Sequence, residues 1–156
     1  MTACKAAMCS RSAKVGSFWW SLTRSTRRNG ARRRLSIYEN TGMCRLIAHP
    51  ERYVILQNEP WRAELWTERG AVLQVTRSGI FGAFGRRAAE TARVLLERDL
   101  AFCVASDGHG TVYRRPILED VNAWLAEHFG AAYAERMLHE NPRRILSGEA
   151  GKERIA

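Results

Sequence analysis

The sequence predicts an α/β protein with parallel strands, and three observations lead to this class. Short apolar runs, typical of buried strands, alternate with segments whose apolar residues recur at helical spacing. Strand and helix follow one another along the chain, as they do in parallel βα units. Polar, chemically capable residues come directly after two of the strand-like runs, as they do at the active-site face of α/β barrels. Because three strands cannot close a barrel, the pattern also suggests that a larger fold is represented only in part.

The predicted elements begin at residue 36 and can be assigned in chain order. Short runs rich in apolar or β-branched residues predict three strands, at 45–48, 71–76 and 101–105. Apolar residues at helical spacing predict helices at 60–69, 86–98, 116–129 and 131–139, with a last short one from Pro142. Gly70 and Gly130 are expected to end the helices that precede them, and Pro116 to open one. Glycine-containing polar stretches at 78–85 and 106–115 are expected to be loops.

The basic excess of the chain is confined to its first part. Of the formal net charge of +9, residues 1–43 contribute +8, from nine Lys or Arg and one acid, whereas residues 44–156 are nearly balanced, with 16 Lys or Arg against 15 acids. Residues 1–35 show no helical or strand period and are predicted to be a disordered leader. Two interpretations stay open: a basic arm that contacts nucleic acid or an anionic membrane, and a leader that is not native to the protein.

Composition excludes several other classes of protein. No apolar run approaches the roughly 20 residues that cross a bilayer, and no signal peptide is recognisable, so a cytoplasmic protein is expected. The four cysteines lack C-x-x-C spacing, which argues against a zinc ribbon. Cys44 and Cys103 lie in strand-like runs and are expected to be buried, reduced thiols. Cys9 lacks the glycine-rich C-x5-R loop of thiol-based phosphatases, so it is not expected to be catalytic.

Two polar clusters follow predicted strands and carry the chemistry. His49-Pro50-Glu51-Arg52 comes after the strand at 45–48, and Asp107-Gly108-His109 comes after the strand at 101–105. Parallel strands bring their carboxyl ends to one edge, so these side chains are expected to converge. A mixed set of imidazole and carboxylate ligands suits Mn, Zn or Fe, and such an ion activates water near neutral pH. The planar guanidinium of Arg52 suits phosphate oxygens, so hydrolysis of a phosphate ester is predicted.

Other conspicuous residues allow a plainer interpretation. Glu51 either orients Arg52 or faces solvent. The glycines between Gly79 and Gly85 either admit a phosphate to the backbone or serve as turn residues. His128 and His139 lie on predicted helices away from the strand ends and are expected to be structural or surface residues.

Five segments together carry a resemblance to a known family. They are 46–53 (LIAHPERY), 73–76 (LQVT), 82–88 (GAFGRRA), 104–109 (VASDGH) and 140–143 (ENPR). In order and spacing they resemble the C-terminal half of the bacterial metal-dependent protein-tyrosine phosphatases of the polymerase-and-histidinol-phosphatase (PHP) superfamily, the type associated with capsule and exopolysaccharide biosynthesis. The resemblance covers about residues 36–148. The pairing of H-P-E-R-Y with S-D-x-H is more specific than either motif alone.

The resemblance implies a fold, a site and a substrate. The fold would be a partial PHP-type distorted (βα) barrel, divided here into the leader 1–35, the C-terminal part of the phosphatase domain at 36–150 and a tail at 151–156. His49, Asp107 and His109 would be metal ligands, with manganese as the usual metal, and Arg52 would bind the substrate phosphate. Arg52, Asp107 and His109 would form the catalytic set. The substrate would be phosphotyrosine on a protein, expected to be the tail of a bacterial tyrosine kinase.

The sequence departs from the family in its first part. Family members begin with a strand that bears His-x-His, whereas this sequence has no histidine before His49. The resemblance therefore implies missing N-terminal strands, an underligated metal cluster and an inactive or barely active protein. Self-association into a homo-oligomer through exposed strand edges is a further expectation. A non-catalytic remnant that binds a partner or nucleic acid remains the alternative. Histidinol-phosphate phosphatases and nuclease-like PHP domains are nearer alternatives, and the H-P-E-R-Y segment argues against both.

Overall fold

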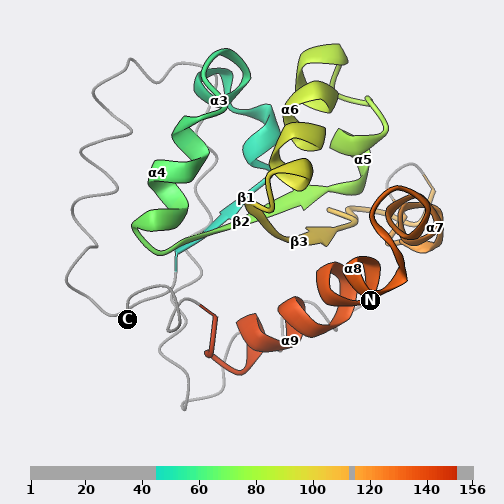
Figure 1. Cartoon of the computed structure of the whole chain (residues 1–156). Helices are drawn as coiled ribbons and strands as arrows, with labels where there is room; N and C mark the ends of the chain where they lie inside the picture. Colours follow the sequence, from blue (N-terminus) through green and yellow to red (C-terminus); the bar gives the residue numbers. More distant parts are fainter. Residues whose placement is uncertain (1–44, 113–114, 151–156) are drawn as a thin grey trace.

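The computed structural model describes residues 45–112 and 115–150 of the chain (Figure 1). Three strands form one sheet in the order β1 (Arg45–Ala48), β2 (Ala71–Thr76) and β3 (Ala101–Ala105). Both neighbouring pairs are parallel. The three predicted strands and the α/β class with parallel strands are therefore confirmed, while closure into a barrel stays a prediction. The predictions for the leader at 1–35, for Cys44 and for the tail at 151–156 lie outside the described residues.

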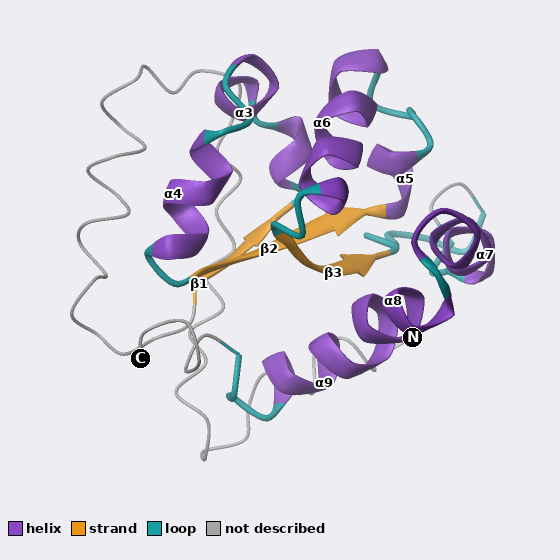
Figure 2. Ribbon diagram, viewed as in Figure 1, coloured by secondary structure: helices purple, strands orange, loops and turns teal. Residues whose placement is uncertain are grey.

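Helices cover the sheet and connect its strands (Figure 2). After β1 come a 3-10 turn, η1, and two short helices: η1 (Pro50–Arg52), α3 (Val54–Asn58) and α4 (Arg62–Glu68). After β2 come α5 (Arg77–Ile80) and α6 (Arg86–Glu97). After β3 come α7 (Glu119–Phe129), α8 (Ala131–Glu135), the π-helical turn η2 (Arg136–Glu140) and α9 (Asn141–Leu146). In Figure 1, α3, α4 and α6 lie on one side of the sheet, and α8 and α9 lie on the other.

The central strand β2 forms the middle of the core. Five of its six residues are buried, and the sixth, Gln74, is half-buried, as expected for a parallel strand covered on both faces. All four residues of β1 remain half-exposed, because among the described residues β1 pairs only with β2. The fully buried side chains that pack around the sheet come from every layer: Leu56, Leu73, Val75, Ile80, Leu95, Val121, Leu125 and Met137. The apolar face predicted for residues 86–98 is confirmed, since Ala88, Ala92, Leu95 and Leu96 are buried.

Two predictions about local structure were wrong. Residues 78–85 are not a loop throughout, because Arg77–Ile80 form a helical turn capped by Thr76, whose side-chain oxygen accepts a hydrogen bond from the Gly79 amide. The helix predicted from Pro116 begins only at Glu119. Pro116 instead packs against Gly108, where an added Cβ would lie 3.1 Å from the proline ring, so it belongs to the loop after β3.

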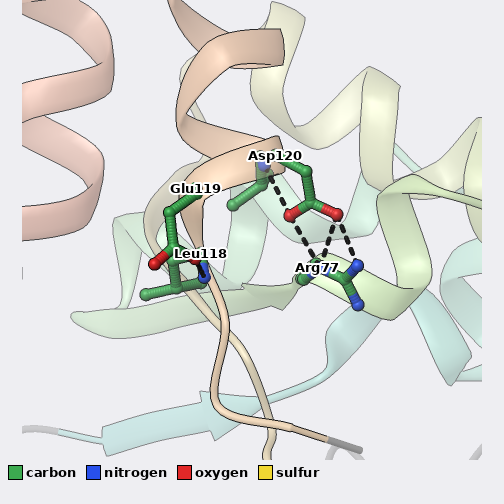
Figure 3. A network of polar contacts seen from close by, with 5 residues as sticks. Arg77, Leu118, Glu119 and Asp120 are labelled. Atoms are coloured by element: carbon green, nitrogen blue, oxygen red, sulfur yellow. Dashed lines mark hydrogen bonds and ion pairs between the residues drawn. The ribbon is translucent and has the colours of Figure 1, made fainter.

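An ion pair ties together the segments that follow β2 and β3. The Arg77 guanidinium at the start of α5 donates to both carboxylate oxygens of Asp120 at the start of α7, with Nε–oxygen distances of 2.7 and 2.9 Å (Figure 3). The same carboxylate accepts a hydrogen bond from the Val121 amide at 2.8 Å. Hydrogen bonding to Arg77 lowers the pKa of Asp120. This contact fixes the start of α7 and thus the far end of the loop that carries Asp107 and His109.

Smaller features agree with the sequence. Cys103 is buried, as predicted. Gly70 and Gly130 end their helices with positive φ angles of 78° and 93°. No helix in the described part of the chain is both long and apolar enough to cross a membrane.

Candidate active site

The two predicted clusters lie at the same edge of the sheet. Because the strands are parallel, the carboxyl ends of β1 and β3 point the same way, and His49 and Asp107 come one and two residues after them. The His49 amide donates to the Gln74 carbonyl at 2.9 Å, which extends the β1–β2 ladder by one residue. The edge therefore holds His49 and Arg52 beside β1, and Asp107 and His109 beside β3.

Both strand ends carry unusual backbone geometry. Among the described residues, the non-glycine residues with positive φ are His49, Asp99 and Asp107, at 44°, 53° and 51°. The left-handed conformation costs about 1–2 kcal/mol for a residue with a side chain. Such strain is concentrated at functional sites, where the surrounding structure enforces it. Two of these three residues, His49 and Asp107, are predicted metal ligands, so the strained backbone lies at the predicted site.

Asp107 and His109 are brought together by the loop after β3. The His109 Nδ1 atom lies 2.7 Å from the Asp107 carbonyl oxygen and 3.5 Å from Asp107 Oδ1. A carbonyl oxygen only accepts hydrogen bonds, so Nδ1 carries a proton, and in the neutral imidazole the lone pair is then on Nε2. This is the tautomer that a metal-ligating histidine needs, with Nδ1–H held by an outer partner. The Asp107 side chain is only 9% exposed, whereas that of His109 is 55% exposed.

Arg52 lies at the end of the turn that follows β1. The Arg52 amide donates to the His49 carbonyl at 3.1 Å, so η1 places Arg52 and His49 on one tight turn. The Arg52 side chain is exposed, and its Cζ atom lies 4.5 Å from the centre of the Phe84 ring. A guanidinium held over an aromatic face keeps its in-plane N–H donors available for an anion.

Glu51 neither faces solvent nor lies at the surface beside Arg52. Its side chain is fully buried, and Oε1 accepts hydrogen bonds from the Thr76 hydroxyl at 2.6 Å and from the Thr76 amide at 3.3 Å. Burial raises the pKa of Glu51 to about 7, against the lowering effects of the Thr76 hydrogen bonds and of the Arg52 charge. The sequence left two interpretations of Glu51 open, that it orients Arg52 or that it faces solvent, and the second is wrong.

Tyr53 completes the same turn on its inner side. Its ring is 8% exposed and meets the His49 ring edge to face, with centroids 6.2 Å apart. Burial raises the pKa of Tyr53 to about 12, and the charge of Glu51 acts in the same direction. The H-P-E-R-Y segment thus combines two residues at the sheet edge, His49 and Arg52, with three buried residues, Pro50, Glu51 and Tyr53.

The described donors supply only part of a metal site. Two imidazoles and a carboxylate fit a borderline divalent ion, and Asp107 and His109 already lie together. His49 follows β1, and β2 lies between β1 and β3. His49 is therefore about two strand spacings, or ~10 Å, from the end of β3 that carries Asp107. In residues 45–112 and 115–150, no group of three or more His, Cys, Asp or Glu side chains is arranged to hold a metal ion. The residues present therefore do not form a complete site among themselves.

Some residues around the site were not assigned a role from the sequence. Thr76 and Phe84 carried no predicted role, although a threonine at a strand end before a helical turn is a known capping signal. Gly79 is buried against Glu51, which gives it a packing role. His128 stacks on Trp124 and is exposed, and His139 is 55% exposed beside Glu135, so both are surface histidines as expected.

Comparison with known proteins agrees with this geometry. Residues 23–147 match the family described as capsular polysaccharide synthesis, CpsB/CapC. The chain belongs to this family. Over 110 residues, it is 34% identical to tyrosine-protein phosphatase CpsB of Streptococcus pneumoniae, an alignment that covers 67% of this chain and 45% of that protein. Over 108 residues, it is 31% identical to tyrosine-protein phosphatase YwqE of Bacillus subtilis strain 168, covering 69% and 42%.

A solved structure from the same family has the same fold. It is one of the crystal structures of YwqE from Bacillus subtilis and CpsB from Streptococcus pneumoniae, two proteins described as unique metal-dependent tyrosine phosphatases. The match has a TM-score of 0.67 at 29% identity and covers 76% of this chain and 49% of that one. The resemblance drawn from the motifs is thus confirmed. The chain spans about half the length of the curated relatives it matches.

Proposed function

We propose that this chain forms part of a metal-dependent protein-tyrosine phosphatase whose active site lies at the carboxyl edge of the sheet. The observation that carries the proposal is the pair of strained strand ends, where His49 and Asp107 adopt left-handed backbone next to Arg52 and His109. Membership of the CpsB/CapC family and the named activity of the relatives support it.

Each residue has a distinct part in the proposed site. Asp107, His109 and His49 would hold a divalent metal together with donors beyond those described, and manganese is the metal we expect. The bound ion would supply Lewis-acid activation of water. Arg52 would bind the phosphoryl oxygens through its fork of N–H donors and stabilise negative charge that develops on them. The Asp107 carbonyl would keep the His109 imidazole in the tautomer that offers Nε2.

The substrate and setting follow from the same proposal. The relatives are named tyrosine phosphatases, so the substrate would be phosphotyrosine on a protein, with a bacterial tyrosine kinase tail as our expectation. The described strands would belong to a PHP-type distorted barrel, with further strands beyond them. A cytoplasmic location, a homo-oligomer and contact of the basic arm with nucleic acid remain predictions from the sequence.

Phosphate release from a phosphotyrosine peptide tests the proposal. The purified chain is assayed with manganese and again with chelator, beside Arg52→Ala and a control, Arg136→Ala. The Arg136 guanidinium also lies over an aromatic ring, with its Cζ atom 4.9 Å from the centre of the Tyr133 ring. Its partner Asp99 comes just before β3, so Arg136 lies at the opposite edge of the sheet, where the strands begin. We expect manganese-dependent release that is lost in Arg52→Ala and kept in Arg136→Ala. A folded chain that binds metal and phosphate without turnover would favour the non-catalytic alternative.

A further inference from the structure

Glu51 lies between two site residues in the sequence but points into the protein. His49 is half-buried and Arg52 is exposed, whereas the Glu51 side chain has no exposed surface. Its partners lie 25 residues further along the chain, at the junction of β2 and α5. The carboxyl therefore links the turn after β1 to the turn after β2.

The donor and the acceptor can be assigned in each hydrogen bond around this carboxyl. Thr76 Oγ1 accepts a hydrogen bond from the Gly79 amide at 3.0 Å, so its own proton is available to Glu51 Oε1 at 2.6 Å. Gly79 leaves room for the carboxyl, since a Cβ there would lie 2.5 Å from Oε1. The Gln57 side chain donates to the Glu51 carbonyl at 2.9 Å and fixes the backbone of the same residue.

Fold stability alone does not explain a carboxyl at this position. Glu51 Oε2 is buried and has no hydrogen-bond partner among the described residues. A buried polar atom without a partner is costly, and a buried charged group replaced together with its partner by apolar side chains of similar size often causes no loss of stability. Groups that are costly to the fold are concentrated where function requires them.

We propose that Glu51 is a positioning residue: its hydrogen bond to Thr76 fastens the His49–Arg52 turn to the β2–α5 junction and so sets where the Arg52 guanidinium lies. The inference rests on the proposed function in that Arg52 is taken as the phosphate-binding residue. The position of Arg52 can nevertheless be measured without any substrate, because its guanidinium lies over the Phe84 ring.

The test compares two variants of Glu51 in the full chain. Glu51→Met keeps the length of the side chain and removes the acceptor, whereas Glu51→Gln keeps an oxygen for Thr76. The first readout is the ring-current shift of the Arg52 Nε–H signal in NMR spectra, identified by its loss in Phe84→Leu. The second is the dissociation constant for inorganic phosphate. The third is the urea midpoint of unfolding.

A positioning role predicts a specific pattern. Glu51→Met should lose the ring-current shift and bind phosphate about tenfold more weakly, while Glu51→Gln should resemble the wild type. The unfolding midpoint of Glu51→Met should fall, because the buried Thr76 hydroxyl and amide lose their acceptor. In the Arg52→Ala background, Glu51→Met should weaken phosphate binding no further, because Glu51 acts through Arg52. If Glu51→Met does not fold, Thr76→Val against Thr76→Ser removes or keeps the same hydrogen bond from the other side.

Two results separate the inference from the proposed function. Retention of the Arg52 shift in Glu51→Met, or in Thr76→Val where that pair is used, would overturn the positioning role. Loss of the shift with unchanged phosphate affinity would instead count against Arg52 as the phosphate-binding residue, and so against the proposed function. If the wild-type chain binds no phosphate, the proposed function fails, and the NMR shift still decides whether Glu51 positions Arg52.

Discussion

Replacing Gly79 by alanine should disturb the site turn through one steric contact. A Cβ built on Gly79 would lie 2.5, 2.7 and 2.8 Å from Oε1, Cγ and Cδ of Glu51, closer than the 3.0 Å that real Cβ atoms essentially always keep. The φ angle of Gly79 is not in the left-handed region, so the backbone itself accepts alanine. Glu51 is fully buried and cannot move away without losing its hydrogen bonds to Thr76.

The expected magnitude is a loss of about 1–2 kcal/mol in the free energy of unfolding. Inserting a methyl group into a closely packed site costs about 1–3 kcal/mol, and up to about 1 kcal/mol is regained because alanine favours the helical turn α5. Urea denaturation of the wild type and Gly79→Ala measures the difference. Gly110→Ala is the control, because a Cβ there meets nothing within 4 Å and its φ is ordinary. We expect this control to change stability by less than about 0.5 kcal/mol.

A double-mutant cycle assigns the loss to the carboxyl. Glu51→Ala removes the three atoms that the new methyl group would meet, so adding Gly79→Ala to that variant should cost nothing or restore stability by filling space. If Gly79→Ala costs the same in both backgrounds, or leaves the wild type unchanged, the inferred contact between Gly79 and Glu51 is refuted.

Two further stability predictions follow from polar contacts outside the site. The Arg77 guanidinium lowers the pKa of Asp120, so the pair stabilises the fold above the ordinary aspartate pKa of 3.8, and this contribution is lost as pH falls through the lower folded value. Because the Asp120 side chain is 42% exposed, the loss should stay below about 1 kcal/mol, measured as the difference between wild type and Asp120→Asn at pH 6 and at pH 2.5; an equal difference at both pH values would contradict it. Tyr133→Phe removes the hydrogen bond from the Tyr133 hydroxyl to the Leu96 carbonyl at 3.0 Å and should cost about 1 kcal/mol in urea denaturation; no loss would show that water replaces the bond.

The sequence was sufficient for the elements whose pattern is local. The strands β1, β2 and β3 were predictable because each is a short apolar run that ends at polar residues or glycine. The helix α6 was predictable because its small and apolar residues fall on one face. The convergence of His49 and Asp107 on one edge follows from parallel pairing alone, and the structure has that pairing.

Features that depend on contacts between distant residues could not be predicted in this way. The burial of Glu51 depends on Thr76 and Gly79, which lie 25 and 28 residues away, and a charged residue beside Arg52 gives no local sign that it faces the core. The late start of α7 depends on the packing of Pro116 against Gly108 and on the pair between Arg77 and Asp120. The neighbourhood of Arg52 and Phe84 likewise joins two turns that are separate in sequence.

The most direct test of a metal site at this edge is the amount of metal bound per chain. The chain is loaded with manganese, freed of excess metal and analysed for bound ion, beside His109→Ala and Asp107→Ala. His139→Ala is the matched control, because its side chain is 55% exposed, like that of His109, but lies in η2. We expect bound manganese in the wild type and in His139→Ala, and less in both site variants. Unchanged metal content in His109→Ala and Asp107→Ala, with both variants folded, would contradict a metal site at this edge.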